Sequence, residues 1–384
     1  MVKRKLKLKR PFIIIGKILL SVIILFLCAF LFYLYQLHSL TSLGYSKIAS
    51  KKILLTFNKK YVVSIGENKT LNRAFESNDF KESNLDSYSK IKYYDHKNFI
   101  KNINTLISRG YSNSNINLIL AHGNDSDVSE FAKREKIQYL EEFYSISYAK
   151  LKYYDRYVKY SDETGEDEET TVLYVNLGMD KDDYGDPVLI NKFSYDMLVN
   201  KHYSVDKNMV ADDLVKIDKK YTNGEDHFAS KKVLDAFIKM YDAAAKDGLN
   251  LVINSSYRTY DDQEELCNQY QKLYGDSYVN KYMARPGFSE HQTGLSFDVG
   301  SRSSNIFANS KEYTWMLDNA YKYGFILRFP KKYENITGFR YEPWHYRYVG
   351  VDIAKYIYDN DISYEEYYAM FLDKDWYFNC NMLL

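Results

Sequence analysis

Cysteine is scarce in this sequence of 384 residues, which contains only Cys28, Cys267 and Cys380. Structural zinc sites are usually closed by four ligands, among which cysteine thiolates are common. None of the three cysteines lies near the segments around His291 and His345, which carry the candidate metal ligands, so the sequence argues against a zinc site closed by thiolates. Cys267 and Cys380 either form a disulfide in an oxidising compartment or stay as two free thiols, because sequence alone does not fix the distance between their Cα atoms.

The sequence also lacks a surplus of positive charge outside its N-terminus. Residues 1–35 carry seven of the 52 lysines and arginines and no acidic residue. The remaining 45 basic residues are set against 51 acidic residues, so the rest of the chain has a net charge of −6. Proteins that bind nucleic acids typically present a strongly basic face. We therefore expect no nucleic-acid partner.

A long apolar run stands near the N-terminus. Residues 18–35 are uncharged and mostly apolar, and at ~1.5 Å per residue a helix of this length approaches the ~30 Å hydrocarbon core of a membrane. We predict a single transmembrane anchor over residues 12–36, with the basic tail of residues 1–11 in the cytoplasm and the remaining chain outside the cell. A cleaved signal peptide is the alternative, but the run ends in bulky residues rather than in a small-residue cleavage site.

Residues 37–190 are interpreted as a spacer region with two imperfect repeats. The Gly-Tyr-Ser segment at 44–46 recurs at 110–112, and the Tyr-Tyr-Asp segment at 93–95 recurs at 153–155. Each Gly-Tyr-Ser turn is predicted to open a short helix that buries an apolar pair. Chance similarity in a chain rich in Tyr, Lys and Ser is the alternative. Within the spacer, residues 170–177 alternate in the manner of a strand.

The pattern becomes clearer from residue 228 onward. Apolar residues at 233–244 follow helical spacing, and those at 249–253 alternate as in a strand. A second helix follows, with two aspartates in its first turn. The remaining predicted elements are strands at 295–299, at 325–329 and from 345, and a helix at 315–323. This mixed order predicts an α+β fold with a small mixed or antiparallel sheet and flanking helices, because it lacks the regular units of a parallel sheet.

Two separated segments carry the clearest chemistry. His291 and Asp298 flank Gly294, which lets the chain turn without a side chain, and His345 follows in a distant segment. Two imidazoles and one carboxylate leave a fourth position open, which is typical of a catalytic zinc site. If Glu342 stays outside the ligand set, it can accept a proton and pass it to a leaving amine, although it can equally be a surface carboxylate.

Arg258 follows the strand predicted to end at residue 254 and precedes the second helix, so it lies in a loop held by rigid elements. Its planar guanidinium suits a substrate carboxylate in a way that a lysine cannot match. A salt bridge within the fold is the alternative role.

These segments resemble the zinc D-alanyl-D-alanine carboxypeptidases of the VanY type. The resemblance rests on Ser289-x-His291-x-x-Gly294-x-x-x-Asp298 followed by Glu342-x-x-His345, with support from Ser-Ser-Tyr-Arg-Thr-Tyr at 255–260. It covers roughly residues 195–355, less than half of the chain. Ser296 stands where alanine is commoner in that family.

The resemblance implies a Hedgehog-like zinc peptidase domain, placed here at residues 195–358, with a C-terminal extension at 359–384. It implies that His291, Asp298 and His345 bind Zn²⁺ and that Glu342 is the general base and acid. It also implies that Arg258 anchors the free carboxylate of the peptide, and that Ser289 and Gln263 line the pocket.

The implied function is a membrane-anchored extracellular carboxypeptidase that removes the terminal D-Ala from peptidoglycan stem peptides. An LD-carboxypeptidase that acts on tetrapeptide stems is one alternative, because it would use the same metal and arginine. A non-catalytic zinc-bearing module that binds the cell wall is another, although the presence of Glu342 argues against it, since binding alone needs no base. The sequence does not indicate the oligomeric state.

Overall fold

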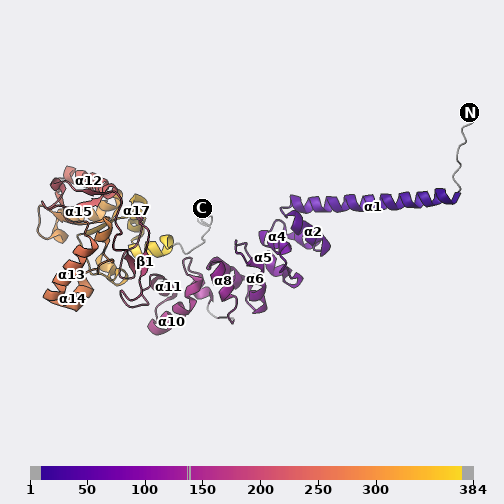
Figure 1. Cartoon of the computed structure of the whole chain (residues 1–384), viewed down its shortest axis with the longest axis horizontal. Helices are drawn as coiled ribbons and strands as arrows, with labels where there is room; N and C mark the ends of the chain where they lie inside the picture. Colours follow the sequence, from indigo (N-terminus) through magenta and orange to yellow (C-terminus); the bar gives the residue numbers. More distant parts are fainter. Residues whose placement is uncertain (1–9, 136, 138–139, 374–384) are drawn as a thin grey trace, which may run out of the picture. The chain divides into compact units, whose positions relative to one another are not determined.

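The computed structural model describes residues 10–135, 137 and 140–373. The described residues divide into two units, the first up to residue 141 and the second from residue 142 to residue 373 (Figure 1). Most of the predicted basic tail, residues 1–9, and the end of the predicted C-terminal extension, residues 374–384, lie outside the described residues. The predicted domain boundaries stay predictions.

The first unit begins with α1, Arg10–Ser42. Residues 14–42 of this helix are long and apolar enough to cross a membrane, with a mean hydropathy of 2.8, and no part of the most apolar 18-residue window is buried within the protein. The helix therefore continues beyond the predicted anchor of residues 12–36. Its membrane role stays a prediction, since a signal sequence near an N-terminus has the same length and composition.

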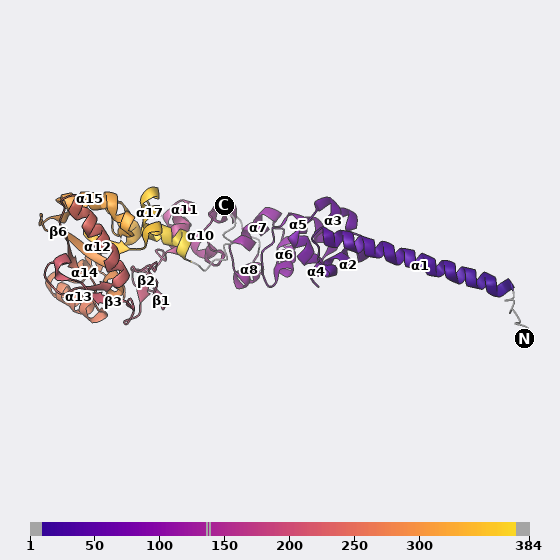
Figure 2. The ribbon, with the colours of Figure 1, turned by 90° about the horizontal axis from the view of Figure 1, so that it is seen from above.

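Short helices make up the rest of the first unit (Figure 2). They are α2 Lys47–Leu55, α3 Lys59–Ile65, α4 Lys69–Glu76, α5 Leu85–Lys90, α6 Phe99–Ser108, α7 Asn113–Ala121 and α8 Asp125–Phe131. The two Gly-Tyr-Ser turns open α2 and α7 as predicted, because the hydroxyls of Ser46 and Ser112 cap these helices. In each turn the tyrosine hydroxyl donates to a backbone carbonyl more than 20 residues later in the same unit. Tyr45 donates to Gly66 at 2.9 Å and Tyr111 to Glu135 at 3.4 Å.

The second predicted repeat has a different structure in its two copies. Residues 93–95 are not helical, whereas residues 151–153 form a 3₁₀ helix that leads into α10, Tyr154–Thr164. The prediction of a strand at 170–177 is wrong, because α11 spans Glu168–Asn176. Asp167 caps this helix by accepting from the Thr170 amide at 2.8 Å, and two glutamates occupy its first turn, where the helix dipole favours negative charge.

The second unit is built around an antiparallel sheet with the strand order β5-β6-β8-β7. These strands are Leu251–Ser255, Ser296–Ser301, His345–Tyr348 and Phe325–Leu327. Helix α12, Lys231–Lys246, packs on one face through Phe237, whose ring lies 5.2 Å from that of Phe297 and 6.5 Å from that of Phe325. Because this face is apolar and fully buried, the polar residues of β6 and β8 are directed to the other face.

The remaining α-helices and strands lie from residue 140 onward, so that the first of them spans the boundary between the two units. They are α9 Leu140–Tyr144, β1 Val188–Ile190, β2 Tyr203–Val205, β3 Leu214–Lys216, β4 Phe228–Ser230, α13 Tyr260–Tyr274, α14 Asp276–Tyr282, α15 Lys311–Asn319, α16 Glu334–Thr337, α17 Val351–Asn360 and α18 Tyr364–Tyr367. Helices and a small antiparallel sheet in mixed order confirm the predicted α+β fold.

Candidate active site

The register of the central strands brings two of the predicted metal ligands together. Asp298 in β6 is the direct cross-strand partner of His345, the first residue of β8. His291 lies in the 3₁₀ helix Glu290–Thr293, just before β6. Gly294 ends this helix with φ +74°, and a Cβ there would approach Leu214 to 3.2 Å, so the turn that brings His291 back over β6 favours glycine.

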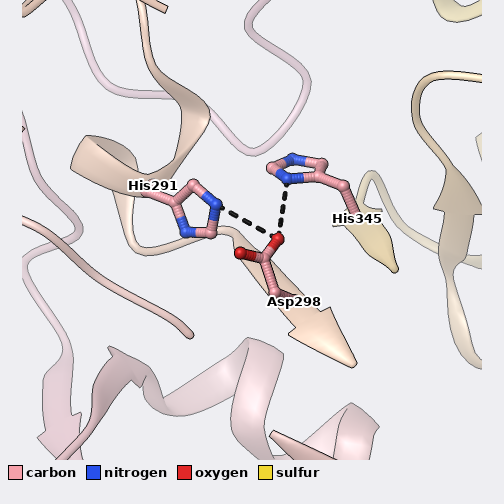
Figure 3. A group of neighbouring side chains, drawn as sticks. All are labelled: His291, Asp298 and His345. Carbon is pink, nitrogen blue, oxygen red and sulfur yellow. Dashed lines mark hydrogen bonds and ion pairs between the residues drawn. The ribbon is translucent and has the colours of Figure 1, made fainter. Parts of the chain in front are cut away.

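His291, Asp298 and His345 converge, and we call them the His-Asp-His group (Figure 3). The Oδ1 atom of Asp298 lies 3.3 Å from Nε2 of His291 and 3.1 Å from Nδ1 of His345. All three candidate ligand atoms lie within 4.8 Å of one another. The rings of the two histidines are nearly perpendicular, at 85°. Two nitrogens and one oxygen at this spacing can surround a single metal ion.

Each histidine is oriented by a hydrogen bond on the ring nitrogen that faces away from Asp298. Nδ1 of His291 donates to the Ser256 carbonyl at 2.7 Å, and Nε2 of His345 donates to Oε2 of Glu290 at 3.1 Å. A carbonyl and an ionised carboxylate can only accept, so these bonds fix the proton on the outer nitrogen. The inner nitrogens, which face Asp298, are then the ones that can bind a metal, and the donor set therefore fits zinc.

The electrostatics around the group favour a bound cation. Burial, assisted by Arg258, lowers the pKa of His291 to about 4, so this ring is neutral at physiological pH. Burial also lowers the pKa of His345, but the hydrogen bonds with Asp298 and Glu290 outweigh it and raise the pKa to about 9. Burial would raise the pKa of Asp298, yet the two histidines hold it well below its usual range. The carboxylates that favour a proton on His345 would also favour a metal cation in its place.

Glu342 lies beside the His-Asp-His group. Its Oε2 atom is 3.8 Å from Nδ1 of His345, and 21% of its side chain is exposed. Burial is the largest cause of a raised pKa, which reaches about 7, and the negative charge of Asp298 acts in the same direction. A carboxylate with a pKa near 7 can both take up and release a proton at physiological pH.

Arg258 also reaches this site. Its backbone amide donates to the His291 carbonyl at 3.1 Å, which ties the loop after β5 to the 3₁₀ helix that carries His291. The Nε atom of Arg258 is buried and has no hydrogen-bond partner among the described residues. Burial lowers the pKa of this guanidinium, against the effect of Asp298 and Glu342. The internal salt bridge that was the alternative role is not present among the described residues, and a buried unpaired donor is suited to an incoming anion.

The site opens into a cavity of about 280 Å³, whose walls include Ser289, Gln263 and Arg258. Nε2 of Gln263 donates to the Ala284 carbonyl at 2.7 Å, and its Oε1 atom is buried without a partner in the described part of the chain. Four further residues of the walls were not indicated by the sequence alone. They are three tyrosines of α13 and α14 and an exposed tryptophan: Tyr270, Tyr278, Tyr282 and Trp344.

Four buried charged residues hold the outer nitrogen of His345 in place through Glu290. We call Glu290, Arg328, Arg347 and Glu365 the buried charge network. Oε1 of Glu290 accepts from Arg328 at 2.8 Å and from Arg347 at 2.9 Å, and Arg328 also donates to both oxygens of Glu365, at 2.6 and 2.9 Å. All four side chains are at most 2% exposed. The two guanidinium groups hold the pKa of Glu290 well below its usual range, although burial acts in the opposite direction.

Sequence reasoning missed the part that this network plays. Glu290 stood inside the motif, and Arg347 shared the alternation of His345, but Arg328 and Glu365 carried no recognisable signal. Cys380 lies outside the described residues, so the two alternatives for Cys267 and Cys380, a disulfide or two free thiols, stay predictions. Cys267 is buried, and its Sγ atom lies 3.4 Å from the Ala284 carbonyl.

The comparisons with known proteins agree with this geometry. The family description "VanY: D-alanyl-D-alanine carboxypeptidase" matches residues 226–351. The putative carboxypeptidase YodJ of Bacillus subtilis strain 168 is 44% identical over 179 residues, which are 44% of this chain and 66% of that protein. The bifunctional D-Ala-D-Ala dipeptidase and D-Ala-D-Ala carboxypeptidase VanXYC of Enterococcus gallinarum is 31% identical over 178 residues, which are 44% of this chain and 92% of that protein. The chain belongs to the VanY family.

Solved structures of similar proteins cover a similar share of the chain. The LdcB LD-carboxypeptidase is 43% identical with a TM-score of 0.43, over 45% of this chain and 85% of that chain. A vancomycin-resistance D,D-pentapeptidase VanY in complex with Zn(II) is 31% identical with a TM-score of 0.40, over 45% of this chain and 99% of that chain. This chain spans only 51% to 66% of the length of three curated relatives that it matches.

The VanY match confirms the family predicted from the motifs. It contains the His-Asp-His group, Glu342, Arg258 and both predicted pocket residues. The buried charge network extends beyond it, because Glu365 follows residue 351. Asn200, which precedes the match, donates to the same carboxylate of Glu365 at 3.1 Å. In this VanY-family chain, the residues that precede and follow the family match therefore take part in the buried charge network or contact it.

Proposed function

We propose that this protein is a zinc carboxypeptidase that removes the terminal D-Ala from peptidoglycan stem peptides. The observation that carries the proposal is the convergence of the His-Asp-His group with a free glutamate and an unpaired arginine in one cavity. Family membership supports the same activity. A binding module would need neither a base beside the metal ligands nor a guanidinium buried without a partner.

His291, Asp298 and His345 would hold the zinc ion, since each directs one donor atom to the same point and the metal would replace the proton that His345 shares with Asp298. When bound there, zinc supplies a Lewis acid that polarises the scissile carbonyl and makes water a better nucleophile at neutral pH. The residues around the three ligands fix the orientation of the ligand side chains. Ser256 and Glu290 hold the two imidazole rings, so the ligands are positioned before the metal arrives.

Glu342 and Arg258 would divide the remaining work. Glu342 takes the proton from the attacking water and returns it to the nitrogen of the departing D-Ala, a role for which a pKa near 7 is suited. Arg258 pairs with the free carboxylate of that D-Ala, which places the last peptide bond, and no other, beside the metal ligands. Gln263 and Ser289 line the cavity that would receive the residues before it.

The apolar helix α1 supports a membrane anchor with the second unit outside the cell. Six lysines and arginines precede or begin this helix, and a cationic flank of this kind favours a cytoplasmic N-terminus. In that orientation the cavity would share a compartment with peptidoglycan. Stem peptides are attached to the wall, so a tethered enzyme would meet them without diffusing away.

The test is release of D-Ala by the full-length protein in detergent. The substrates are a pentapeptide stem that ends in D-Ala-D-Ala, a tetrapeptide stem and an amidated pentapeptide, each with and without a chelator and with zinc content measured in parallel. We expect release from the pentapeptide, loss of release with the chelator, and recovery after zinc is added back.

The same assay separates the alternatives. Preferred cleavage of the tetrapeptide would replace the DD-specificity with LD-specificity and leave the metal chemistry intact. Binding of the stems without release of D-Ala, in a sample that holds one zinc ion per chain, would contradict the hydrolase and favour a wall-binding module.

A further inference from the structure

The first residues after the apolar run form a hairpin that returns toward it. Helix α1 ends at Ser42, a tight turn follows in which the Tyr45 amide donates to the Leu40 carbonyl at 3.2 Å, and α2 then lies beside the last turns of α1 in both views (Figures 1 and 2). Over nine residues, α2 returns by roughly 13 Å along α1. Its far end therefore lies next to the part of α1 that precedes Ser42 by about two turns.

Hydrogen bonds fix the level of that far end. The ammonium group of Lys59, the first residue of α3, donates to the side chains of Gln36 and Ser39 on α1, the latter at 2.6 Å. Gln36 directly follows Tyr35, where the uncharged apolar run ends. The headgroup layer of a bilayer is roughly 5–8 Å thick on each side of the hydrocarbon core. The turn between α2 and α3, residues 55–59, consequently lies at the height of the lipid headgroups if α1 spans the membrane.

This turn exposes large apolar side chains. Leu55 is 77% exposed and Phe57 is 92% exposed. Phe57 also has φ +58°, which makes it the left-handed residue that ends α2: its amide donates to the Leu54 carbonyl, and the Asn58 amide donates to the Ile53 carbonyl. Glycine is the usual residue in this motif, because a side chain there is strained. Neither local conformation nor packing within the protein accounts for a phenylalanine here.

The charges around the turn fit an anionic surface. Residues 36–66 contain five lysines and no acidic residue, and the first acidic residue of the whole chain is Glu67. The five lysines are Lys47, Lys51, Lys52, Lys59 and Lys60. Two of them that flank the turn, Lys51 and Lys60, are exposed. Apolar side chains next to lysines are typical of protein segments that lie in the interface of a membrane containing anionic lipids.

We propose that the α2–α3 turn is a second membrane contact, in which Phe57 and Leu55 insert among the lipid headgroups of the outer leaflet and the neighbouring lysines pair with anionic lipids. The partner is the bilayer that α1 crosses, so the inference rests on the proposed membrane anchor. The aromatic residues Tyr33 and Tyr35, at the outer end of the uncharged apolar run, are suited to the same layer. With both contacts, α1 and the helices beside it would be held at a fixed height above the lipid.

The test measures how deeply single sites lie in the bilayer. Three full-length variants each keep one cysteine: the native Cys28 in α1, Phe57→Cys in the turn, and Ile48→Cys near the opposite end of α2, where the native isoleucine is 66% exposed. In the latter two, the native cysteines are replaced by alanine. Each protein is spin-labelled and reconstituted into vesicles of phosphatidylcholine and phosphatidylglycerol. Collisions with oxygen, which dissolves in lipid, are compared with collisions with a water-soluble nickel chelate.

We expect the ratio of oxygen to nickel collisions to be high at position 28, several-fold higher at position 57 than at position 48, and low at position 48. Equal ratios at 57 and 48, with position 28 still in lipid, would overturn the proposal and leave the anchor intact. A low ratio at position 28 would overturn the anchor and this proposal together. Dipolar broadening at position 57 would indicate that a second copy of the chain covers the turn, and would also overturn it. Release of D-Ala, measured on the same samples, reports on the proposed catalytic function independently of these depths.

Discussion

Glu342 lies next to the His-Asp-His group without belonging to it, so its replacement separates metal binding from turnover. We expect Glu342→Gln to keep one zinc ion per chain, because the ligand atoms are unchanged, and to lower kcat by roughly 10²- to 10⁴-fold, because an amide cannot accept the proton. D-Ala release and zinc content are measured on the same sample. Glu264→Gln, on the exposed side of α13, is the matched control and should behave as the wild type. Normal turnover by Glu342→Gln would show that another group is the base.

Arg258 can be tested by changing its geometry while its charge is kept. We expect Arg258→Lys to raise KM for peptides with a free C-terminus by roughly tenfold or more, because one charge-assisted hydrogen bond to the carboxylate contributes about 1.5–3 kcal/mol. Amidated peptides should be affected far less. Arg302→Lys, in which the native guanidinium bonds to the carbonyls of Lys220 and Thr222, is the control. Equal losses on free and amidated peptides would remove the anchoring role.

At this scale the sequence predicted which residues converge in the structure and missed those that hold them in place. His291, Asp298, Glu342 and His345 could be selected because their types and spacing match the proposed chemistry. The position of Glu290 between two arginines depends on strands and loops far apart in the chain, and no local pattern encodes it. The buried Nε atom of Arg258, which has no hydrogen-bond partner in the described part of the chain, is likewise a property of the packed structure.

Short elements decide how the second unit supports its site, and α18 is the clearest case. Glu365, from this four-residue helix, is fully buried against Arg328, which in turn holds Glu290 behind His345. We expect Glu365→Gln to destabilise the second unit by about 3–5 kcal/mol, since breaking a buried ion pair leaves a charge uncompensated. Zinc affinity should fall by roughly tenfold, because the support of a ligating histidine is loosened.

Both quantities for Glu365→Gln can be measured, zinc affinity by competition with a chelating dye and stability by denaturant unfolding. Glu366→Gln is a close control, because Glu366 accepts from the Ser363 amide at the start of the same helix and a glutamine oxygen can still accept there. Unchanged zinc affinity in a destabilised Glu365→Gln protein would reduce the role of α18 to packing alone.

Element prediction failed where two periodicities were both compatible with the residues. Residues 170–177 alternate between polar and apolar side chains, yet Val172, Leu173 and Val175 are buried on a helix. The cap formed by Asp167 and the glutamates that follow it were local signals for that helix. In contrast, β6 and β8 were predictable, because alternation over five or more residues in each segment had no competing helical pattern.

At the scale of the whole chain, the second unit includes more than the segments that carry the catalytic motifs. It starts at residue 142 and therefore contains α10 and α11. Contacts far apart in sequence join them to the rest: Tyr203 donates to the Asn176 carbonyl at 3.3 Å, and the side chain of Asn335 donates to Tyr174 at 3.0 Å. Partners 27 and 161 residues away cannot be recognised from composition or periodicity.

Metal removal should affect the two units differently. Zinc at 100 to 1,000 times its Kd stabilises the folded state by about 2.7 to 4.1 kcal/mol, so we expect a chelator to lower the Tm of the second unit by roughly 5–15 °C. The Tm of the first unit should not change, because the His-Asp-His group belongs entirely to the second unit. Scanning calorimetry with zinc added back measures both transitions, and Asp298→Asn should be insensitive to the chelator. A parallel shift of both transitions would contradict this independence.

The position of Glu365 has a practical consequence for anyone who shortens this protein. A fragment that stops at residue 351, where the family match ends, would keep two interior guanidinium groups with one carboxylate between them. Such a fragment is expected to be insoluble or to hold its metal poorly even though every recognised motif is present. Soluble enzyme for inhibitor screening should therefore extend at least through Leu372, the end of the helical segment that follows Glu365.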